Sequence, residues 1–365
     1  MRLDLYITRR FIWSFLLVFS VFLGIVVLID MVEQIRRYDT SQVGLLTAAE
    51  LALLNTPTIM YRMLPLLVVL STIALFLGLA RTSEMVVTRA AGRSALRTLM
   101  APVVTTALFG ALAVAAFNPI VAATSEQYAE ISRQYQQDPQ SVTAVGDEGL
   151  WIRQGSAGGQ IVIRAKRANP DGTRFFGVQF YGFNADGDAI YRIEADEALL
   201  QPGYWTLTSA KRWDFEAGSN PERAAERQPE MTVPSDLTRD QIRDSFGSPA
   251  SIPIWELPGF INKLDRAGFS ALKHRVWLQM ELANPLMMVA MVLIGAGFTM
   301  RHTRFGRTGM MVLFAVLMGF SIFFLRNFAQ VLGENGQIPV ALAAWMPPLA
   351  GIFMSLGLLF HTEDG

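Results

Sequence analysis

The stretch FIWSFLLVFSVFLGIVVLI, residues 11–29, decides what kind of protein this chain is, because its 19 residues include no Asp, Glu, Lys or Arg. The hydrocarbon core of a bilayer is about 30 Å thick, and a helix needs roughly 18 or more apolar residues to cross it. The stretch follows the basic segment MRLDLYITRR, as a signal peptide would, but the next residues, DMVEQIRRYD, contain no small-residue cleavage site. We therefore interpret it as an uncleaved membrane-spanning helix.

Five more stretches are free of these charged residues and long enough to cross a bilayer. They cover residues 63–80, 98–125, 282–300, 308–325 and 336–360. Hydrophobic residues make up 52% of the 365-residue chain and its mean hydropathy is +0.32, both high for a soluble protein. Backbone polar groups cannot stay unpaired in lipid, so the stretches are expected to be helices. The sequence predicts a polytopic α-helical membrane protein with six transmembrane helices.

Arginine residues indicate the direction in which the helices run. With the N-terminus inside, ten arginines fall in short inner segments and four in short outer segments, which agrees with the positive-inside rule. The inner arginines are Arg2, Arg9, Arg10, Arg81, Arg89, Arg93, Arg97, Arg301, Arg304 and Arg307. The outer arginines are Arg36, Arg37, Arg62 and Arg326. Both termini are thus expected inside, and the long segment after the third helix outside.

That long segment, residues 126–275, has the composition of a β domain inserted between two membrane halves, 1–125 and 276–365. Short runs rich in aromatic and β-branched residues are separated by turns that contain glycine. The expected strands lie at 149–153, 160–167, 174–183, 189–198 and 204–215. We expect an antiparallel sandwich or open jelly roll, with 220–230 as an exposed loop. Residues 127–137 are expected to continue the third helix, and 253–269 to form a short helix that returns the chain to the membrane.

No motif for covalent chemistry occurs in the chain. Cysteine is absent, which excludes disulfides and thiolate sites. There is no phosphate-binding loop, nucleophile elbow or zinc-protease pair. The three histidines, at 274, 302 and 361, lie near span ends without ligand spacing. We predict a protein that is not an enzyme and that binds no metal or cofactor.

The charges near the spans bear on the energy source. Asp30, Arg62, Glu281 and Arg326 lie at the ends of the charge-free stretches, and none lies inside one. A buried carboxylate would indicate a proton or ion path. Without one, ion-coupled transport is disfavoured, and the energy is expected to come from another subunit.

One candidate site is the segment DMVEQIRRYD, 30–39, where Arg36 and Arg37 follow the first span. Arginine binds phosphate through its planar fork, so the pair could meet a phosphate-bearing ligand at the outer leaflet. Interfacial snorkelling explains the same pair equally well. Glu33, in the same segment, and Arg62 complete the set of candidate substrate-binding residues.

The other candidate site is the segment RTSEMVVTRAAGRSALR, 81–97, between the second and third spans. Thr82 or Ser83 could cap a short helix over about 82–92 that begins near Glu84, and Gly92 could end it. Such a helix on the inner surface suits contact with another protein. The alternative is a capped turn whose arginines only set the topology.

Four stretches together resemble the LptF/LptG permeases of the lipopolysaccharide exporter. They are LARTSEMVVTRAAG (79–92), GLWIR (149–153), ANPLMMVAMVLIGAGF (283–298) and RFGRTGMMVLFAVLMGF (304–320). The order of three helices, an outer β domain and three helices matches that family over essentially the whole chain. The stretch MVEQIRR, 31–37, favours the LptG branch over its paralogue LptF.

The resemblance implies a permease of the bacterial inner membrane with a periplasmic jelly roll. It would pair with an LptF-like paralogue, be driven by an LptB-like ATPase dimer, and pass lipopolysaccharide to a bridge of LptC and LptA; no nucleic acid is involved. Glu84 would open the coupling helix, with Ser83 and Gly92 at its ends. Arg89 and Arg93 would be further contacts with the ATPase, while Arg36 and Arg37 would face lipid A phosphates. Asp30 departs from the family pattern, because some relatives carry a basic residue near that position.

Three other functions remain open at this point. The chain could be the LptF-type subunit, or a permease acting on lipoproteins or in signalling. Such four-helix permeases carry their external domain after the first helix, whereas here it follows the third. A membrane scaffold without transport would not depend on an ATPase.

Overall fold

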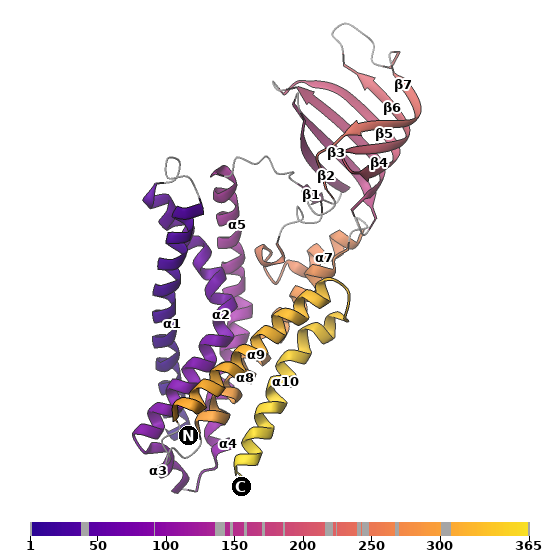
Figure 1. The fold of residues 1–365 in the computed structure, drawn as a ribbon. Coiled ribbons are helices and arrows are strands. Elements are labelled where there is room, and N and C mark those ends of the chain that lie inside the picture. The colour runs from indigo at the N-terminus through magenta and orange to yellow at the C-terminus, as the bar shows by residue number, and fades with distance from the viewer. Residues whose placement is uncertain are drawn as a thin grey trace. The chain divides into compact units, whose positions relative to one another are not determined.

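The computed structural model divides the chain into two compact units, and each is described by itself (Figure 1). The first, here the membrane unit, comprises Met1–Gln136, Ala250–Trp255 and Leu272–Gly365, and the second, the sheet unit, comprises Gln137–Pro249 and Glu256–Ala271. The structure describes residues 2–37, 44–90, 92–135, 143–146, 149–156, 159–169, 172–184, 187–215, 222–223, 225–238, 242, 248–266, 270–300 and 308–363.

Six helical segments of the membrane unit are long and apolar enough to cross a membrane, which confirms the six predicted spans by length and composition. They are α1 (Arg2–Arg37), α2 (Leu45–Arg81), the run of α4 (Ala95–Leu112), η1 (Ala113–Phe117) and α5 (Asn118–Tyr135), then α8 (Leu272–Thr299), α9 (Thr308–Glu334) and α10 (Val340–Glu363). The short helix α3 (Glu84–Ala90) lies between α2 and α4, at the end of the unit that also carries both termini (Figure 1). We call this end the terminal face.

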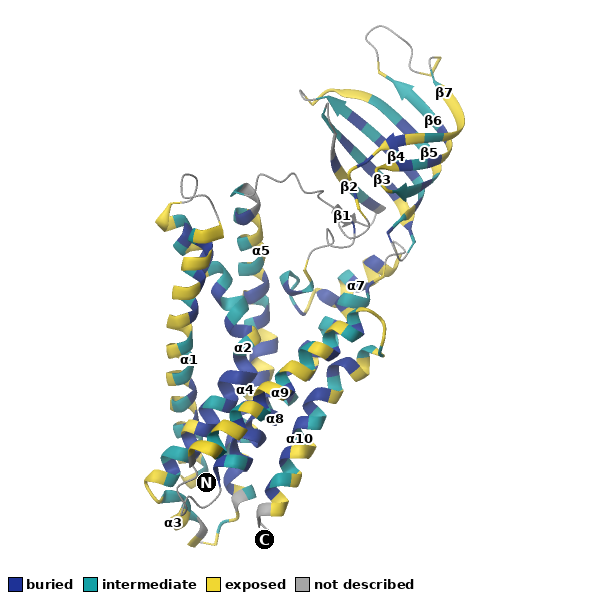
Figure 2. Ribbon diagram, viewed as in Figure 1, coloured by how far each residue is buried: buried dark blue, intermediate teal, exposed yellow. Residues whose placement is uncertain are grey.

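Helices α2 and α8 form the centre of the membrane unit, and α1 lies at its edge (Figure 2). In the apolar windows of α2 and α8, 67% and 72% of the residues are buried, compared with 11% in α1. The central helices approach closely because small residues face each other. A Cβ atom added to Gly295 would lie 2.9 Å from the Cβ of Thr72, so a larger side chain here would force α2 and α8 apart.

The third span contains a π-helical turn, η1, which no pattern in the sequence predicted. Such turns insert a residue into an α-helix and often occur at functional sites. Here residues 250–255 of the same unit form hydrogen bonds with the turn and with the residue that follows it. The indole Nε1 of Trp255 donates to the carbonyl of Ala115 at 3.0 Å, and the amide of Ile254 donates to Asn118 Oδ1 at 2.9 Å.

The sheet unit holds seven described strands that pair antiparallel in the order of the sequence, as a meander. They are β1 (Thr143–Gly146), β2 (Gly149–Ser156), β3 (Gly159–Ala168), β4 (Arg174–Asn184), β5 (Ala189–Gln201), β6 (Tyr204–Asp214) and β7 (Glu226–Pro234). Figure 1 shows the sheet strongly curved. Its apolar face buries Trp205 against Phe175 and Phe180, with ring centroids 5.0 and 6.1 Å apart. Near it, helix α7 (Leu257–Arg266) buries one apolar stripe.

The predicted antiparallel β domain is confirmed, and each of the five predicted strands coincides with one of β2 to β6. The described strands all belong to one curved sheet, so the two facing sheets of a sandwich are not formed by them. The prediction of a loop over 220–230 was wrong for its second half, where β7 begins at Glu226. Most of β7 is exposed, so it lacks the buried alternation that identifies a strand in sequence, and it carries Pro229, which an edge strand tolerates.

Candidate functional site

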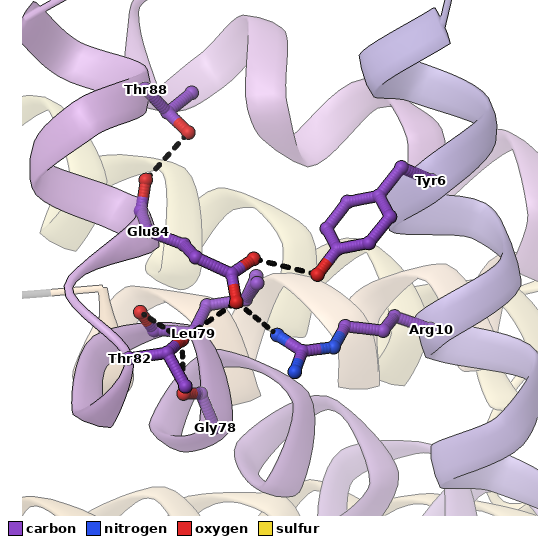
Figure 3. A network of polar contacts seen from close by, with 7 residues as sticks. All are labelled: Tyr6, Arg10, Gly78, Leu79, Thr82, Glu84 and Thr88. Atoms are coloured by element: carbon purple, nitrogen blue, oxygen red, sulfur yellow. Dashed lines mark hydrogen bonds and ion pairs between the residues drawn. The ribbon is translucent and has the colours of Figure 1, made fainter.

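Glu84, the first residue of α3, is the centre of a polar network on the terminal face (Figure 3). Its Oε1 accepts hydrogen bonds from Arg10 Nη1 at 2.9 Å and from Thr82 Oγ1 at 2.8 Å. Its Oε2 accepts from the hydroxyl of Tyr6 at 2.8 Å. The side chains of Arg10 and Glu84 are 38% and 32% exposed. The predicted helix start at Glu84 is confirmed, and the side chain faces α1.

The turn before α3 is built by the backbone and not by a side-chain cap. Ser83 has φ +58°, in the left-handed region, and its carbonyl accepts from the amides of Val86 and Val87 at 3.1 and 3.2 Å. The hydroxyl of Thr82 donates to Glu84 and to the carbonyl of Gly78. Neither hydroxyl accepts a hydrogen bond from an amide of the described residues. The predicted side-chain cap was therefore wrong.

The surroundings of Glu84 favour its ionised form. Partial burial of the carboxyl raises its pKa, but hydrogen bonds from Thr82 and Tyr6 and the positive charge of Arg10 act more strongly in the opposite direction. The net effect lowers the pKa of Glu84 below its usual range. The carboxylate is thus an anion at neutral pH, and a partner that competes for it must replace these donors.

A second contact joins the residues that follow α3 to α1. Arg93 forms an ion pair with Asp4, and one guanidinium nitrogen also donates to the carbonyl of Arg97 at 3.2 Å. Gly92 has φ +78°, as a residue that ends a short helix often does. The side chain of Arg89, the remaining candidate of this segment, lies outside the described residues.

The candidate substrate-binding residues do not form one cluster. Arg36, Arg37 and Glu33 are exposed at the last turns of α1, where Arg37 donates to the hydroxyl of Tyr128 at 3.4 Å. Arg62 lies inside α2. At 1.5 Å per residue, its separation from Arg37 along the antiparallel helices is roughly 20 Å.

A cluster of polar side chains, some of them buried, lies near the C-terminal end of α1. Asn55 donates to Asp30 Oδ1 at 3.0 Å, and Gln34 donates to the hydroxyl of Tyr128 at 3.1 Å. Asp30 is 7% exposed, and its Oδ2 has no hydrogen-bond partner among the described residues. Gln34 also donates to Asp30 Oδ1 at 3.4 Å, so hydrogen bonds through Gln34 and Tyr128 connect this carboxylate with Arg37 across α1, α2 and α5.

The expectation that no carboxylate is buried in the spans was wrong. Glu281 lies inside α8 and is 1% exposed, and the hydroxyl of Tyr61 donates a hydrogen bond to it. Arg326 of α9 and Arg62 of α2 interact with Glu281 electrostatically. Both arginines line a cavity of about 280 Å³ beside it, and neither donates a hydrogen bond to a described residue. Charge-free windows placed Glu281 and Arg326 at span ends, and only the helix packing shows that both line one cavity.

Metal binding finds no support in the part of the chain that the structure describes. Within it, no group of three or more His, Cys, Asp or Glu side chains could hold a metal ion. The polar sites described above consist of arginine, carboxylate, amide and hydroxyl groups. Their chemistry suits the binding of charged partners and polar headgroups.

Comparisons with known proteins agree with the fold. The family model described as Lipopolysaccharide export system permease LptF/LptG matches residues 5–361. The Lipopolysaccharide export system permease protein LptG of Escherichia coli (strain K12) is 23% identical over 364 residues, which cover 99% of this chain and 98% of that protein. The protein of the same name from Haemophilus influenzae is 22% identical over 371 residues, 99% of each chain. Because the family match extends through all six helices and the sheet between them, the chain belongs to the LptF/LptG family of lipopolysaccharide export system permeases.

Proposed function

We propose that the chain is the LptG-type permease subunit of a lipopolysaccharide exporter in the bacterial inner membrane. It takes lipopolysaccharide from the outer leaflet and passes it to a periplasmic bridge. The observation that carries the proposal is the family match over residues 5–361. The LptG assignment is supported by the relatives in Escherichia coli and Haemophilus influenzae, which are LptG proteins.

The chain works with partners that supply the energy for transport. The sequence contains no ATP-binding loop, so ATP is bound and hydrolysed by an LptB-like dimer on the cytoplasmic side. An LptF-like paralogue completes the membrane pathway, and LptC- and LptA-like proteins receive the lipid. The arginine distribution supports cytoplasmic termini and a periplasmic domain within residues 126–275.

The exposed end of α1 is the proposed entry point for the substrate. Arg36 and Arg37 bind lipid A phosphates through charge-assisted hydrogen bonds, and Glu33 lies one turn before Arg37. Arg62 contacts a deeper part of the lipid. Its position in the wall of the Glu281 cavity supports this separation of roles.

The terminal face is the proposed contact with the ATPase. Helix α3 fits a groove of that subunit, with Ser83 and Glu84 at its start and Arg89, Gly92 and Arg93 at and beyond its end. Exposed apolar residues of α3 support this placement, since Val86 and Val87 are 56% and 68% exposed. Unpaired apolar groups at a water-facing surface favour burial by a partner.

Purification and lipid cross-linking test the proposal together. The chain is expressed with its neighbouring genes, and the purified complex is analysed for an ATPase and for lipopolysaccharide cross-linked near the end of α1. In Arg36→Glu with Arg37→Glu, cross-linking should fall by about tenfold or more, because charge-assisted contacts are replaced by repulsion. Arg2→Glu, at the other end of the same helix, is the matched control.

Each arm of the experiment has a result that contradicts one statement. If no ATPase co-purifies with the unchanged chain, the proposed transport role is wrong. If the doubly substituted chain assembles and cross-links lipopolysaccharide normally, the phosphate site at Arg36 and Arg37 is wrong, although the transport role stands.

A further inference from the structure

The carboxylate of Glu84 is bound by α1 of its own chain. Two of its three hydrogen-bond donors, Arg10 and Tyr6, belong to α1 and lie 74 and 78 residues away in sequence (Figure 3). An ionised carboxylate offers about four lone-pair positions, so three hydrogen bonds use most of them. A partner protein could contact Glu84 fully only by displacing α1.

Contacts within α1 position the two donors, Tyr6 and Arg10, independently of Glu84. Tyr6 and Arg10 are four residues apart and therefore lie on one face of the helix. The Arg10 guanidinium carbon also lies 5.5 Å from the centre of the Tyr6 ring, a cation–π contact. This contact limits the conformations that Arg10 can adopt and lowers the entropy lost when Glu84 binds.

A second ion pair connects the same two parts of the chain. Arg93, three residues beyond the end of α3, pairs with Asp4 of α1. Both ends of the segment that contains α3 are therefore attached to the first ten residues of α1. Two attachments fix the orientation of α3 relative to α1, whereas α3 could rotate about a single ion pair.

Helix α1 is more exposed than the other spans. Of the six spans it has the smallest buried share, 11% of its apolar window (Figure 2). Segments with few buried contacts are displaced at a lower free-energy cost than central ones. A movement of α3 would thus be passed to α1 through the contacts of Glu84 and Arg93.

We propose that Glu84 is a positioning residue that fastens α3 to α1, so that α1 follows any displacement of α3. The proposal rests on the proposed function, in which an ATPase moves α3. It assigns to Glu84 a role inside the chain: Glu84 acts through Tyr6 and Arg10, and the contact with the ATPase is made by other residues of α3. The helix that carries the substrate-binding arginines at its far end is thereby linked directly to the energy source.

A charge swap tests this assignment. Glu84→Arg and Arg10→Glu each remove the ion pair, and the double variant restores it in reverse. The hydroxyls of Tyr6 and Thr82 can accept as well as donate, so they tolerate the reversal. Arg9→Glu is the matched control, because Arg9 is the exposed neighbour of Arg10 and has no described hydrogen bond or ion pair.

The first readout is ATP-driven release of lipopolysaccharide by the reconstituted complex. Each single variant should lose about fivefold in release per ATP hydrolysed, as expected for a partly exposed ion pair, and the double variant should recover most of it. The control should match the unchanged chain. A double variant as impaired as the two losses combined would overturn the proposal, since a lost ATPase contact cannot be restored by a change in α1.

The second readout is the distance between α1 and α3, which does not depend on transport. The chain has no cysteine, so Leu5→Cys and Val87→Cys, at positions 73% and 68% exposed, accept spin labels selectively. The labelled chain should give a narrow distance distribution that broadens in each single variant and narrows again in the double. If the distances are unchanged in the single variants, the attachment proposed here is wrong. If instead the ATPase binds neither the unchanged chain nor any variant, the proposed function is wrong. The distance measurement still shows whether Glu84 attaches α3 to α1.

Discussion

At the scale of single residues, Glu281 is the least exposed carboxylate among the described residues of the membrane unit. Removal of an ion from water costs several kcal/mol unless charges and hydrogen bonds replace the water. The hydroxyl of Tyr61 donates to Glu281, and Arg62 and Arg326 supply positive charge nearby. Tyr61 lies 220 residues away in sequence. The site therefore depends on contacts among α2, α8 and α9, and each partner is costly to remove alone.

Substitution of Glu281 should destabilise the chain strongly. In Glu281→Ala, the Tyr61 hydroxyl loses its hydrogen-bond acceptor, and Arg62 and Arg326 lose the negative charge beside them. The free energy of unfolding should therefore fall by about 3–5 kcal/mol. Glu281→Gln keeps an acceptor for Tyr61 and should cost less. Thermal unfolding in detergent measures both. Glu33→Gln, at an exposed position of α1, should change the stability by less than about 0.5 kcal/mol; equal losses at positions 33 and 281 would contradict the burial argument.

At the scale of elements, α3 is bracketed by two residues in the left-handed region. Ser83 precedes it with φ +58°, and Gly92 follows it with φ +78°. A side chain with a Cβ atom costs roughly 1–2 kcal/mol in that region, and glycine avoids the cost. Ser83 is therefore in a strained backbone conformation, whereas Gly92, at the other end of α3, is not strained. Both turns are thus encoded by backbone conformation, and the orientation of α3 follows from them.

A pair of glycine substitutions separates backbone strain from crowding. A Cβ atom added at Gly92 or at Gly78 would meet no atom within 4 Å. Gly92→Ala should nevertheless destabilise by about 1 kcal/mol because of its positive φ, whereas Gly78→Ala, inside α2, should stabilise by up to about 1 kcal/mol. Unfolding in denaturant measures both changes. A gain in stability at position 92 would show that the turn can relax into another conformation.

The extent to which elements could be predicted depends on whether their signal is local. Strands β2 to β6 were predicted because aromatic and β-branched runs end at glycine turns, and the helix start at Glu84 was predicted from its neighbours. Strand β7 and the π-turn η1 were missed, since their stability comes from β6 and from Trp255. Among the candidate site residues, Glu84 was predicted correctly as the start of a short helix, but its partners on α1 were not predicted. Those partners lie more than 70 residues away, a separation that no local pattern encodes.

At the scale of the whole molecule, the chain consists of two units with separate cores. The sheet unit buries Trp205, Phe175 and Phe180 within itself, and the membrane unit buries the facing sides of α2 and α8. The sheet unit is inserted between the third and fourth spans, and residues 250–255 of the membrane unit interrupt it. An element with its own core can fold by itself. The insertion therefore leaves the packing of the six spans independent of the sheet.

A fragment spanning residues 137–271 should fold without the spans. It should unfold cooperatively in urea, and Trp205→Ala should lower its stability by about 3–5 kcal/mol because the indole is fully buried. Trp151→Ala should cost about 1 kcal/mol, since Trp151 is half-buried and stacks on Arg164. A parent fragment with a broad, non-cooperative transition would show that the sheet depends on the membrane unit.

The π-helical turn at Ala113–Phe117 has a consequence for how the length of the third span can change. Loss of one residue there would convert the turn into ordinary α-helix and rotate everything after it by about 100°. Asn118 would then leave the Ile254 amide, and Tyr128 would leave Gln34 and Arg37. Exposed side chains along the span can be exchanged with little effect on these contacts, whereas a single-residue deletion in the turn would break contacts in two places at once.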